Sequence, residues 1–172
     1  MKFQIVKGHS KHLSELLLLY KKVAEMSHGI IRNRDEINED YISSFLNSSI
    51  ENGLILVAIL EGRIIGEIHA YTPKIYAFQH ILTDLTIVVN PKKQGIGIGR
   101  KLFERFLEIV DKDLSHIKRI ELYTREHNLR NVKFYESLGF VNEGRQKDKI
   151  FISPSRFETP LHMARMASDS NK

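Results

Sequence analysis

The chain has 172 residues, a net charge of +5, 42% hydrophobic and 27% charged residues, and no cysteine. This balance favours one globular domain and excludes a disordered chain, while the missing cysteine excludes disulfides, thiolate metal sites and an acyl intermediate on cysteine. No stretch approaches the ~18 consecutive apolar residues of a membrane span, and no signal-peptide core lies near the start, so we expect a cytoplasmic protein without a membrane partner.

The basic residues are spread along the chain, with short clusters only at Lys92–Lys93 and at 145–149. No predicted helix carries lysine and arginine along one face, which is the pattern that nucleic-acid binding favours. A phosphorylated cofactor explains a modest positive charge equally well. We therefore expect no nucleic-acid partner.

In chain order, the first half of the sequence contains apolar residues at helical spacing and apolar runs typical of strands. Ser10 is a fair N-cap, and apolar residues recur at helical spacing after it, which predicts a helix. Further along, two runs rich in isoleucine and valine are separated by the turn Glu61-Gly62, which predicts a hairpin. The predicted elements are a strand at 1–6, a helix at 11–27, a helix starting at Asp35 or Asn38 and ending at Asn52, and strands at 54–60, 63–71 and 81–89.

The second half begins with a glycine-rich segment that leads directly into a helix. The predicted elements are a helix at 100–112, a strand at 119–124, a short helix at 131–138, strands at 140–141, 150–152 and 161–166, and a frayed polar tail at 167–172. Hairpins followed by a crossover imply an α/β protein with a mixed sheet and helices on its faces. No linker divides the chain, so we expect a single domain over 1–166.

The segment Gln94–Gly99 lies between a strand and a helix N-terminus. The first turn of a helix carries unpaired N–H groups and partial positive charge, and glycines let a ligand approach the backbone closely. The segment therefore predicts a phosphate or pyrophosphate site.

Three other interpretations of this loop are a dinucleotide fingerprint, a Walker loop and a structural turn. A dinucleotide fingerprint fits poorly, because the position that its third glycine needs is Arg100 and the preceding strands form a hairpin rather than βαβ units. A Walker loop is excluded because no Gly-Lys-Ser/Thr follows. A structural turn that only packs the helix on the strand remains as the alternative.

Two motifs carry a resemblance to a known family. Gln94-x-x-Gly97-x-Gly99, after a Val-Val-Asn-Pro strand end, resembles the signature of the Gcn5-related N-acetyltransferase (GNAT) superfamily. Downstream, the segment from Asn128 to Phe140 is similar to the Asn-x-x-Ala-x-x-x-Tyr-Glu-x-Leu-Gly-Phe segment of the same family, with Asn131 in place of the usual alanine. The resemblance covers roughly residues 54 to 166.

This resemblance implies a mostly antiparallel sheet of six to seven strands flanked by about four helices, and acetyl-CoA as co-substrate without a metal. In the family, amides of the glycine loop hold the pyrophosphate, amides of the preceding strand hold the pantetheine arm and polarise the acetyl carbonyl, and a tyrosine protonates the departing thiolate. The implied cofactor-binding residues are Ile87, Val88, Val89, Gln94, Gly95, Ile96, Gly97, Ile98, Gly99, Arg100, Asn128 and Tyr135, with Tyr135 also catalytic. A core aromatic residue and a plain helix cap are the alternatives for Tyr135 and Asn128.

A base is also needed, because an alkylamine with a pKa near ~10 is neutral in only about one molecule in a thousand at pH 7. Asp84 is the first candidate, since an acid among isoleucine, leucine and valine needs an explanation. Glu67 and His69 are the next candidates, and they share one strand face by alternation. We expect His69 to lie opposite Thr83. The weaker candidates are His80, expected on a surface loop, and Glu121.

We therefore expect an N-acetyltransferase that moves the acetyl group of acetyl-CoA directly to a primary amine of a small molecule, peptide or protein. The alternative is a non-catalytic acyl-CoA-binding sensor on the same scaffold, which needs no base. The histidines show no metal-ligand spacing. The sequence does not identify the amine, and it leaves open whether the chain forms a homodimer.

Overall fold

The computed structural model describes residues 3–26 and 29–167. Residues 1–2 of the predicted first strand, Ser27 at the end of the predicted first helix, and 168–172 of the predicted tail lie outside these residues. The strands are β1 (Gln4–Lys7), β2 (Gly53–Leu60), β3 (Arg63–Tyr71), β4 (Ile81–Val89), β5 (Arg119–Arg125), β6 (Val141–Arg145), β7 (Ile150–Ser153), β8 (Arg156–Glu158) and β9 (Pro160–Met166). The α-helices are α1 (Leu13–Ala24), α2 (Glu39–Asn52), α3 (Ile98–Asp113) and α4 (Leu129–Glu136).

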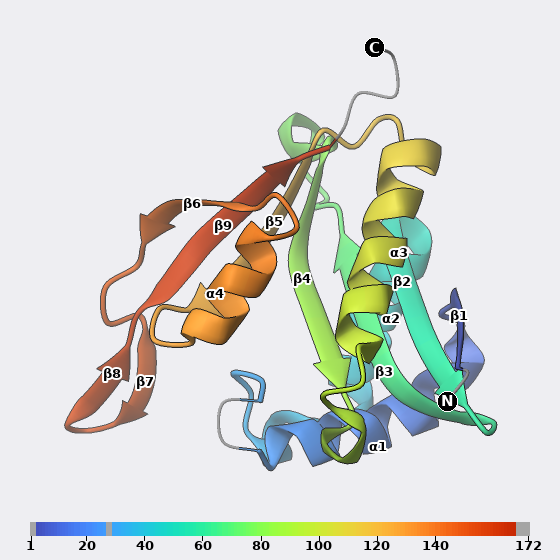
Figure 1. Cartoon of the computed structure of the whole chain (residues 1–172), viewed down its shortest axis with the longest axis horizontal. Coiled ribbons are helices and arrows are strands. Elements are labelled where there is room, and N and C mark those ends of the chain that lie inside the picture. Colours follow the sequence, from blue (N-terminus) through green and yellow to red (C-terminus); the bar gives the residue numbers. More distant parts are fainter. Residues whose placement is uncertain (1–2, 27–28, 168–172) are drawn as a thin grey trace.

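Seven of the strands form one sheet in the order β1-β2-β3-β4-β5-β9-β6. Its neighbouring strands are antiparallel except for β4 and β5, which run parallel. Strands β7 and β8 form a separate hairpin, which projects away from the sheet in Figure 1. The mixed, mostly antiparallel sheet with helices on its faces confirms the predicted fold class.

Helices cover both faces of the sheet and divide the core in two. On one face α3 packs against the sheet through Leu102, Phe103 and Phe106 (Figure 1), and Tyr135 of α4 belongs to the same cluster. On the other face α1 and α2 pack through a second cluster that includes Leu16 and Ile42. Because both faces of the sheet are covered, strands β2 and β3 are buried almost throughout.

Local signals placed most element boundaries well. The Glu61-Gly62 turn has positive φ at both residues, as the hairpin prediction requires. Asn38, not Asp35, caps α2, since its Oδ1 accepts from the Tyr41 N–H at 2.9 Å. The prediction for Ser10 was wrong: a short 3₁₀ turn, Ser10–His12, precedes α1 and has His9 as its N-cap. Strand β8 was not predicted.

The parallel pair β4 and β5 is short, and this shapes the functional site. The two strands pair only at Ile81 with Arg119 and at Leu82 with Ile120, and beyond these pairs they diverge. The pairing of β3 with β4 also shifts register next to Asp84, whose φ of 53° is unusual for a residue with a side chain. The splayed strands leave the sheet open between them.

Candidate active site

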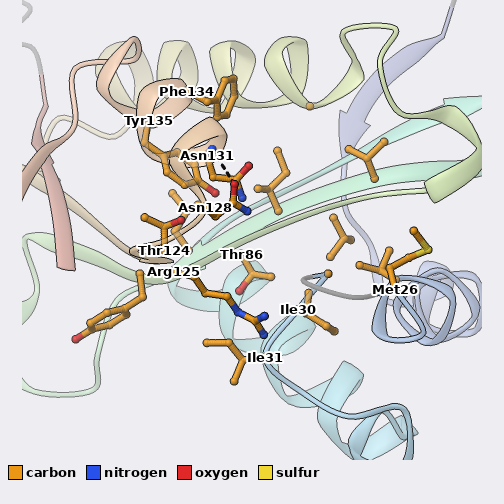
Figure 2. Close-up of a pocket in the computed structure, with 18 of the residues that line it drawn as sticks. Met26, Ile30, Ile31, Thr86, Thr124, Arg125, Asn128, Asn131, Phe134 and Tyr135 are labelled. Carbon is orange, nitrogen blue, oxygen red and sulfur yellow. Dashed lines mark hydrogen bonds between the residues drawn. The ribbon is translucent and has the colours of Figure 1, made fainter. Parts of the chain in front are cut away.

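A cleft of about 1260 Å³ is lined by residues of both splayed strands, the glycine loop, α4, α2 and the loop after α1. Figure 2 shows Tyr135, Asn128 and Thr124 gathered on one side of this cleft, with Met26 and Ile30 on the opposite side. The cleft therefore brings together the two sequence motifs and the residues that lie N-terminal to them.

The glycine loop has the geometry that an anion site requires. Gly95 and Gly97 have φ of 82° and 84°, and a Cβ at either position would meet no atom within 4 Å. Gly97 is the N-cap of α3 and provides no side-chain cap. Within the described part of the chain, the N–H groups of Gly95, Ile96 and Gly97 donate no hydrogen bond. Open space before unpaired amides at a helix N-terminus fits a phosphate group.

Most of the predicted loop residues line the cleft. They are Gln94, Gly95, Gly97, Ile98, Gly99 and Arg100. Ile96 does not, and its side chain is half exposed, so only its backbone is available to a ligand there. Arg100 donates to Ser137 Oγ at 3.2 Å and lies over the Phe134 ring, which ties the start of α3 to α4.

The N–H groups of successive residues in β4 point in opposite directions, so the predicted backbone donors of this strand do not all face the cleft. The Asn90 N–H donates to the Ile65 carbonyl of β3 at 2.8 Å, and Val88 is paired with Glu67 of the same strand. Successive N–H groups of a strand point to opposite edges, so the Val88 amide faces β3 while those of Ile87 and Val89 face the gap toward β5. The set of backbone donors for a ligand in the gap narrows to Ile87 and Val89.

Tyr135 and Asn128 come from the second motif and both line the cleft. The Asn128 Oδ1 accepts from the Asn131 N–H at 3.1 Å, so Asn128 is indeed the N-cap of α4, and its side-chain NH₂ remains to donate. Tyr135 is 8% exposed, and burial raises the pKa of its phenol to about 12. The phenol is therefore protonated, and a donor, at neutral pH.

Glu67 and His69 form a buried network with Tyr20, which the sequence analysis did not single out. The Tyr20 hydroxyl donates to Glu67 Oε2 at 2.6 Å, and His69 Nδ1 lies 3.0 Å from Glu67 Oε1 and 3.3 Å from the Tyr20 hydroxyl. Glu67 is fully buried and His69 is 2% exposed. Burial and the neighbouring Glu67 raise the pKa of Tyr20 well above its usual value.

This network determines the tautomer of His69 and which edge of its ring faces the cleft. The tautomer that satisfies the contacts places the Nδ1 proton toward Glu67 and leaves Nε2 as an acceptor. Phe45 stacks on the imidazole with centroids 4.1 Å apart, and Tyr71 stacks at 6.3 Å. His69 lines the cleft but Glu67 and Tyr20 do not. The ring edge that carries Nε2 is therefore the part of this network that a substrate can meet.

Asp84 lies on β4, the strand next to the one that carries His69, at the register shift between β3 and β4. It is exposed and lines the cleft together with Tyr71. Burial raises the pKa of Tyr71 to about 12, and the charge of Asp84 and its hydrogen bond with Tyr71 add to the shift. Asp84 therefore places a carboxylate at the cleft, held beside a phenol.

The expected cross-strand position of His69 was wrong. Tyr71, not His69, is paired with Thr83, and His69 is paired with Thr86; the shift at Asp84 accounts for one residue of this difference. Glu121 pairs with Arg119 at 2.5 Å and is absent from the cleft lining, as is the exposed His80. The cleft residues that sequence reasoning missed include Arg32, Tyr41 and Phe45, which come from a loop and a helix without a motif.

Among the described residues, no helix is long and apolar enough to cross a membrane.

Comparison with known proteins identifies the family of this site. The family model described as the acetyltransferase (GNAT) family matches residues 18–140. Spermidine N(1)-acetyltransferase of Vibrio cholerae is 31% identical over 74 residues, which are 43% of this chain and 42% of that protein. The match thus spans less than half the length of this curated relative.

Solved structures show the same fold over almost the whole chain. A GNAT-family acetyltransferase from Streptococcus pneumoniae has a TM-score of 0.81 at 23% identity, covering 97% of this chain and 100% of the other. The yncA protein of Salmonella typhimurium, solved with its cofactor acetyl-CoA, has a TM-score of 0.84 at 16% identity, covering 100% of this chain and 98% of the other.

Proposed function

The chain belongs to the GNAT family of acetyltransferases, and from this premise we propose that it transfers an acetyl group from acetyl-CoA to a primary amine of a small molecule or peptide. The observation that carries the proposal is the single cleft that joins the open α3 N-terminus, the buried phenol of Tyr135, and the pair His69 and Asp84. This cleft supplies an anion site, a proton donor and proton acceptors along one path.

The cofactor would lie along the splayed strands. The amides of Gly95, Ile96 and Gly97 would hold the pyrophosphate, with Arg100 beside them. The free amides of Ile87 and Val89 would pair with the pantetheine arm and polarise the acetyl carbonyl, and the Asn128 NH₂ would donate to the same arm. Backbone donors aimed at a developing oxyanion are commonly the largest catalytic contribution.

Asp84 would bind the amine substrate, and His69 would remove its proton. The carboxylate of Asp84 attracts the ammonium form, and Tyr71 holds this carboxylate in place. His69 Nε2 accepts a proton from the ammonium, directly or through one water. Glu67 then stabilises the imidazolium that forms, from 3.0 Å away.

Acetyl-CoA supplies a thioester, whose carbon–sulfur bond breaks as the amine nitrogen bonds to the carbonyl carbon. Tyr135 gives its phenol proton to the departing sulfur. The nitrogen loses one proton to His69 before it attacks and a second afterwards, and this second proton restores the phenol of Tyr135. The products are an amide, a free thiol and one proton on His69, which returns to solvent.

Calorimetric titration with acetyl-CoA, with NAD as the control ligand, tests the cofactor assignment first. We expect one-to-one binding in the micromolar range for acetyl-CoA and none for NAD. Thiol release is then followed with a panel of primary amines. Tight binding without acetyl transfer to any amine would instead support the sensor function, and failure to bind acetyl-CoA would overturn the proposal.

A further inference from the structure

The charged residues that line the cleft fall into two groups. Lys93, Arg100 and Arg130 adjoin the glycine loop and α4, where the phosphates of the cofactor are expected. The remaining charged residues, at the end where the amine is expected, are Arg32, Glu36, Asp84 and Arg125. This end thus carries two basic and two acidic side chains, so it is not an acidic pocket.

Two of these four side chains are engaged by neighbours. Arg125 lies 3.3 Å from the buried carboxylate of Glu158, and Glu36 Oε2 accepts from the Asn33 N–H at 2.8 Å. Within residues 3–26 and 29–167, Arg32, Asp84 and Glu36 have no ion-pair partner, and of these three only the Glu36 carboxylate accepts a backbone hydrogen bond. Arg32 and Asp84 therefore present one positive and one negative charge to a substrate, with Glu36 as a second acidic group.

A tyrosine lies beside each of these charges. The guanidinium of Arg32 lies 4.2 Å from the centroid of the Tyr41 ring, and Asp84 bonds to Tyr71. Burial raises the pKa of Tyr41, which Arg32 opposes and Asp84 reinforces, and the pKa of Tyr71 responds to the same two charges. Both charged side chains line the same cleft, so one ligand in it can meet both.

We propose that the amine acceptor is a zwitterion whose ammonium group binds at Asp84 and whose carboxylate binds to Arg32. This inference rests on the proposed function and narrows it to amino acids and similar small amino carboxylates. A guanidinium suits a carboxylate because it offers parallel N–H donors, and stacking on Tyr41 orients it in advance. A polyamine is disfavoured, because a second ammonium group would meet Arg32 instead of a carboxylate.

Matched acceptor pairs test this assignment. The pairs are β-alanine with β-alaninamide and 4-aminobutyrate with its amide, and spermidine represents the polyamines. The variants are Arg32→Gln, Arg32→Glu and, as a control, Arg34→Gln. Arg34 lies in the same loop but pairs with Glu25 at 2.6 Å and does not line the cleft.

We expect kcat/KM of the unmodified protein to favour the carboxylate over its amide by at least about tenfold, the size of one charged hydrogen bond. Arg32→Gln should remove most of this preference, Arg32→Glu should shift it toward spermidine, and Arg34→Gln should keep it. Calorimetry of each acceptor, with the protein saturated with CoA, provides a second readout that does not depend on turnover.

Two results would overturn the inference while leaving the proposed function intact. One is a preference of the unmodified protein for spermidine or the amides, and the other is a carboxylate preference that Arg32→Gln does not change. If no amine is acetylated, the proposed function fails separately. In that case, binding of the carboxylates that Arg32→Gln abolishes would still support the zwitterion site, and absence of such binding would contradict it.

Discussion

The pKa of the Tyr135 phenol is raised to about 12, and burial is the cause. Within the described residues its hydroxyl has no protein hydrogen-bond partner. Replacing it by phenylalanine should therefore remove a proton donor and little else. This separates the proposed catalytic role from that of a core aromatic residue, which would be served equally well by phenylalanine.

For Tyr135→Phe we expect kcat to fall by about 10²–10⁴, the usual size of general acid catalysis. The Kd for acetyl-CoA and the free energy of unfolding should stay nearly unchanged. Steady-state kinetics, calorimetry and urea unfolding measure the three quantities. Tyr76→Phe is the control, because Tyr76 is 87% exposed on the loop before β4. Full turnover in Tyr135→Phe would exclude the phenol as proton donor.

The Tyr20–Glu67–His69 network predicts a positioning role for Glu67. In Glu67→Gln, protonated His69 loses the negative charge 3.0 Å away. We expect kcat to fall about tenfold or more at neutral pH, and the acidic limb of the pH–rate profile to move to lower pH, since the charged imidazole is less favoured.

Tyr20→Phe is the matched variant for this experiment. It removes the hydroxyl that donates to Glu67 at 2.6 Å but keeps the carboxylate beside His69. Its acidic limb should therefore stay close to that of the unmodified protein. A purely structural network would lower stability in both variants and leave both pH profiles in place.

At the scale of elements, the loop between β4 and α3 allows a paired comparison of glycines. Gly97 and Gly62 both have positive φ, of 84° and 74°, and both have open space where a Cβ would lie. Alanine at either position should cost about 1–2 kcal/mol in unfolding free energy, because the backbone conformation is unfavourable for it. Only Gly97 lies at the cleft.

We therefore expect Gly97→Ala to weaken acetyl-CoA binding by tenfold or more, whereas Gly62→Ala should leave the Kd unchanged. Calorimetric Kd values and urea unfolding of both variants check this. Equal Kd values for the two variants would indicate that the loop is a structural turn that only packs α3 on the sheet.

Elements with a local signal could be predicted from the sequence, and features made by distant residues could not. The β2–β3 hairpin and α3 follow from one turn and one apolar periodicity. The shift at Asp84 has no such signal, because aspartate at positive φ is not marked by its neighbours. The contact of Tyr20 with Glu67 joins residues 47 apart, and only the packing of α1 on β3 creates it.

The candidate site divides in the same way. The glycine loop and the segment from Asn128 to Tyr135 are short motifs, so the cofactor half could be proposed in advance. The proposed acceptor half is built from Arg32, Tyr41 and Tyr71, which lie on the loop after α1, on α2 and on β3. Its charge balance becomes visible only when the fold brings these elements together.

For the whole molecule, buried tyrosines on both sides of the sheet link stability to pH. Tyr20 belongs to the cluster under α1 and α2, and Tyr135 to the cluster under α3 and α4. Burial raises the pKa of both phenols above the ordinary value of 10. The unfolded chain then loses these protons at lower pH than the folded chain does. This contribution to stability is complete below pH 10 and is lost as pH rises toward the folded pKa.

The free energy of unfolding should accordingly decline between about pH 9 and 11. With a folded pKa of about 12, Tyr135 alone accounts for about 1.3 kcal/mol of this loss. Tyr135→Phe should therefore gain that amount relative to the unmodified protein over the same interval, although the two are equally stable at pH 7. Urea unfolding at intervals of half a pH unit measures the difference. A constant difference from pH 7 to 11 would mean that the phenol ionises as easily in the folded cleft as in water, which would contradict the burial of Tyr135 in the structure.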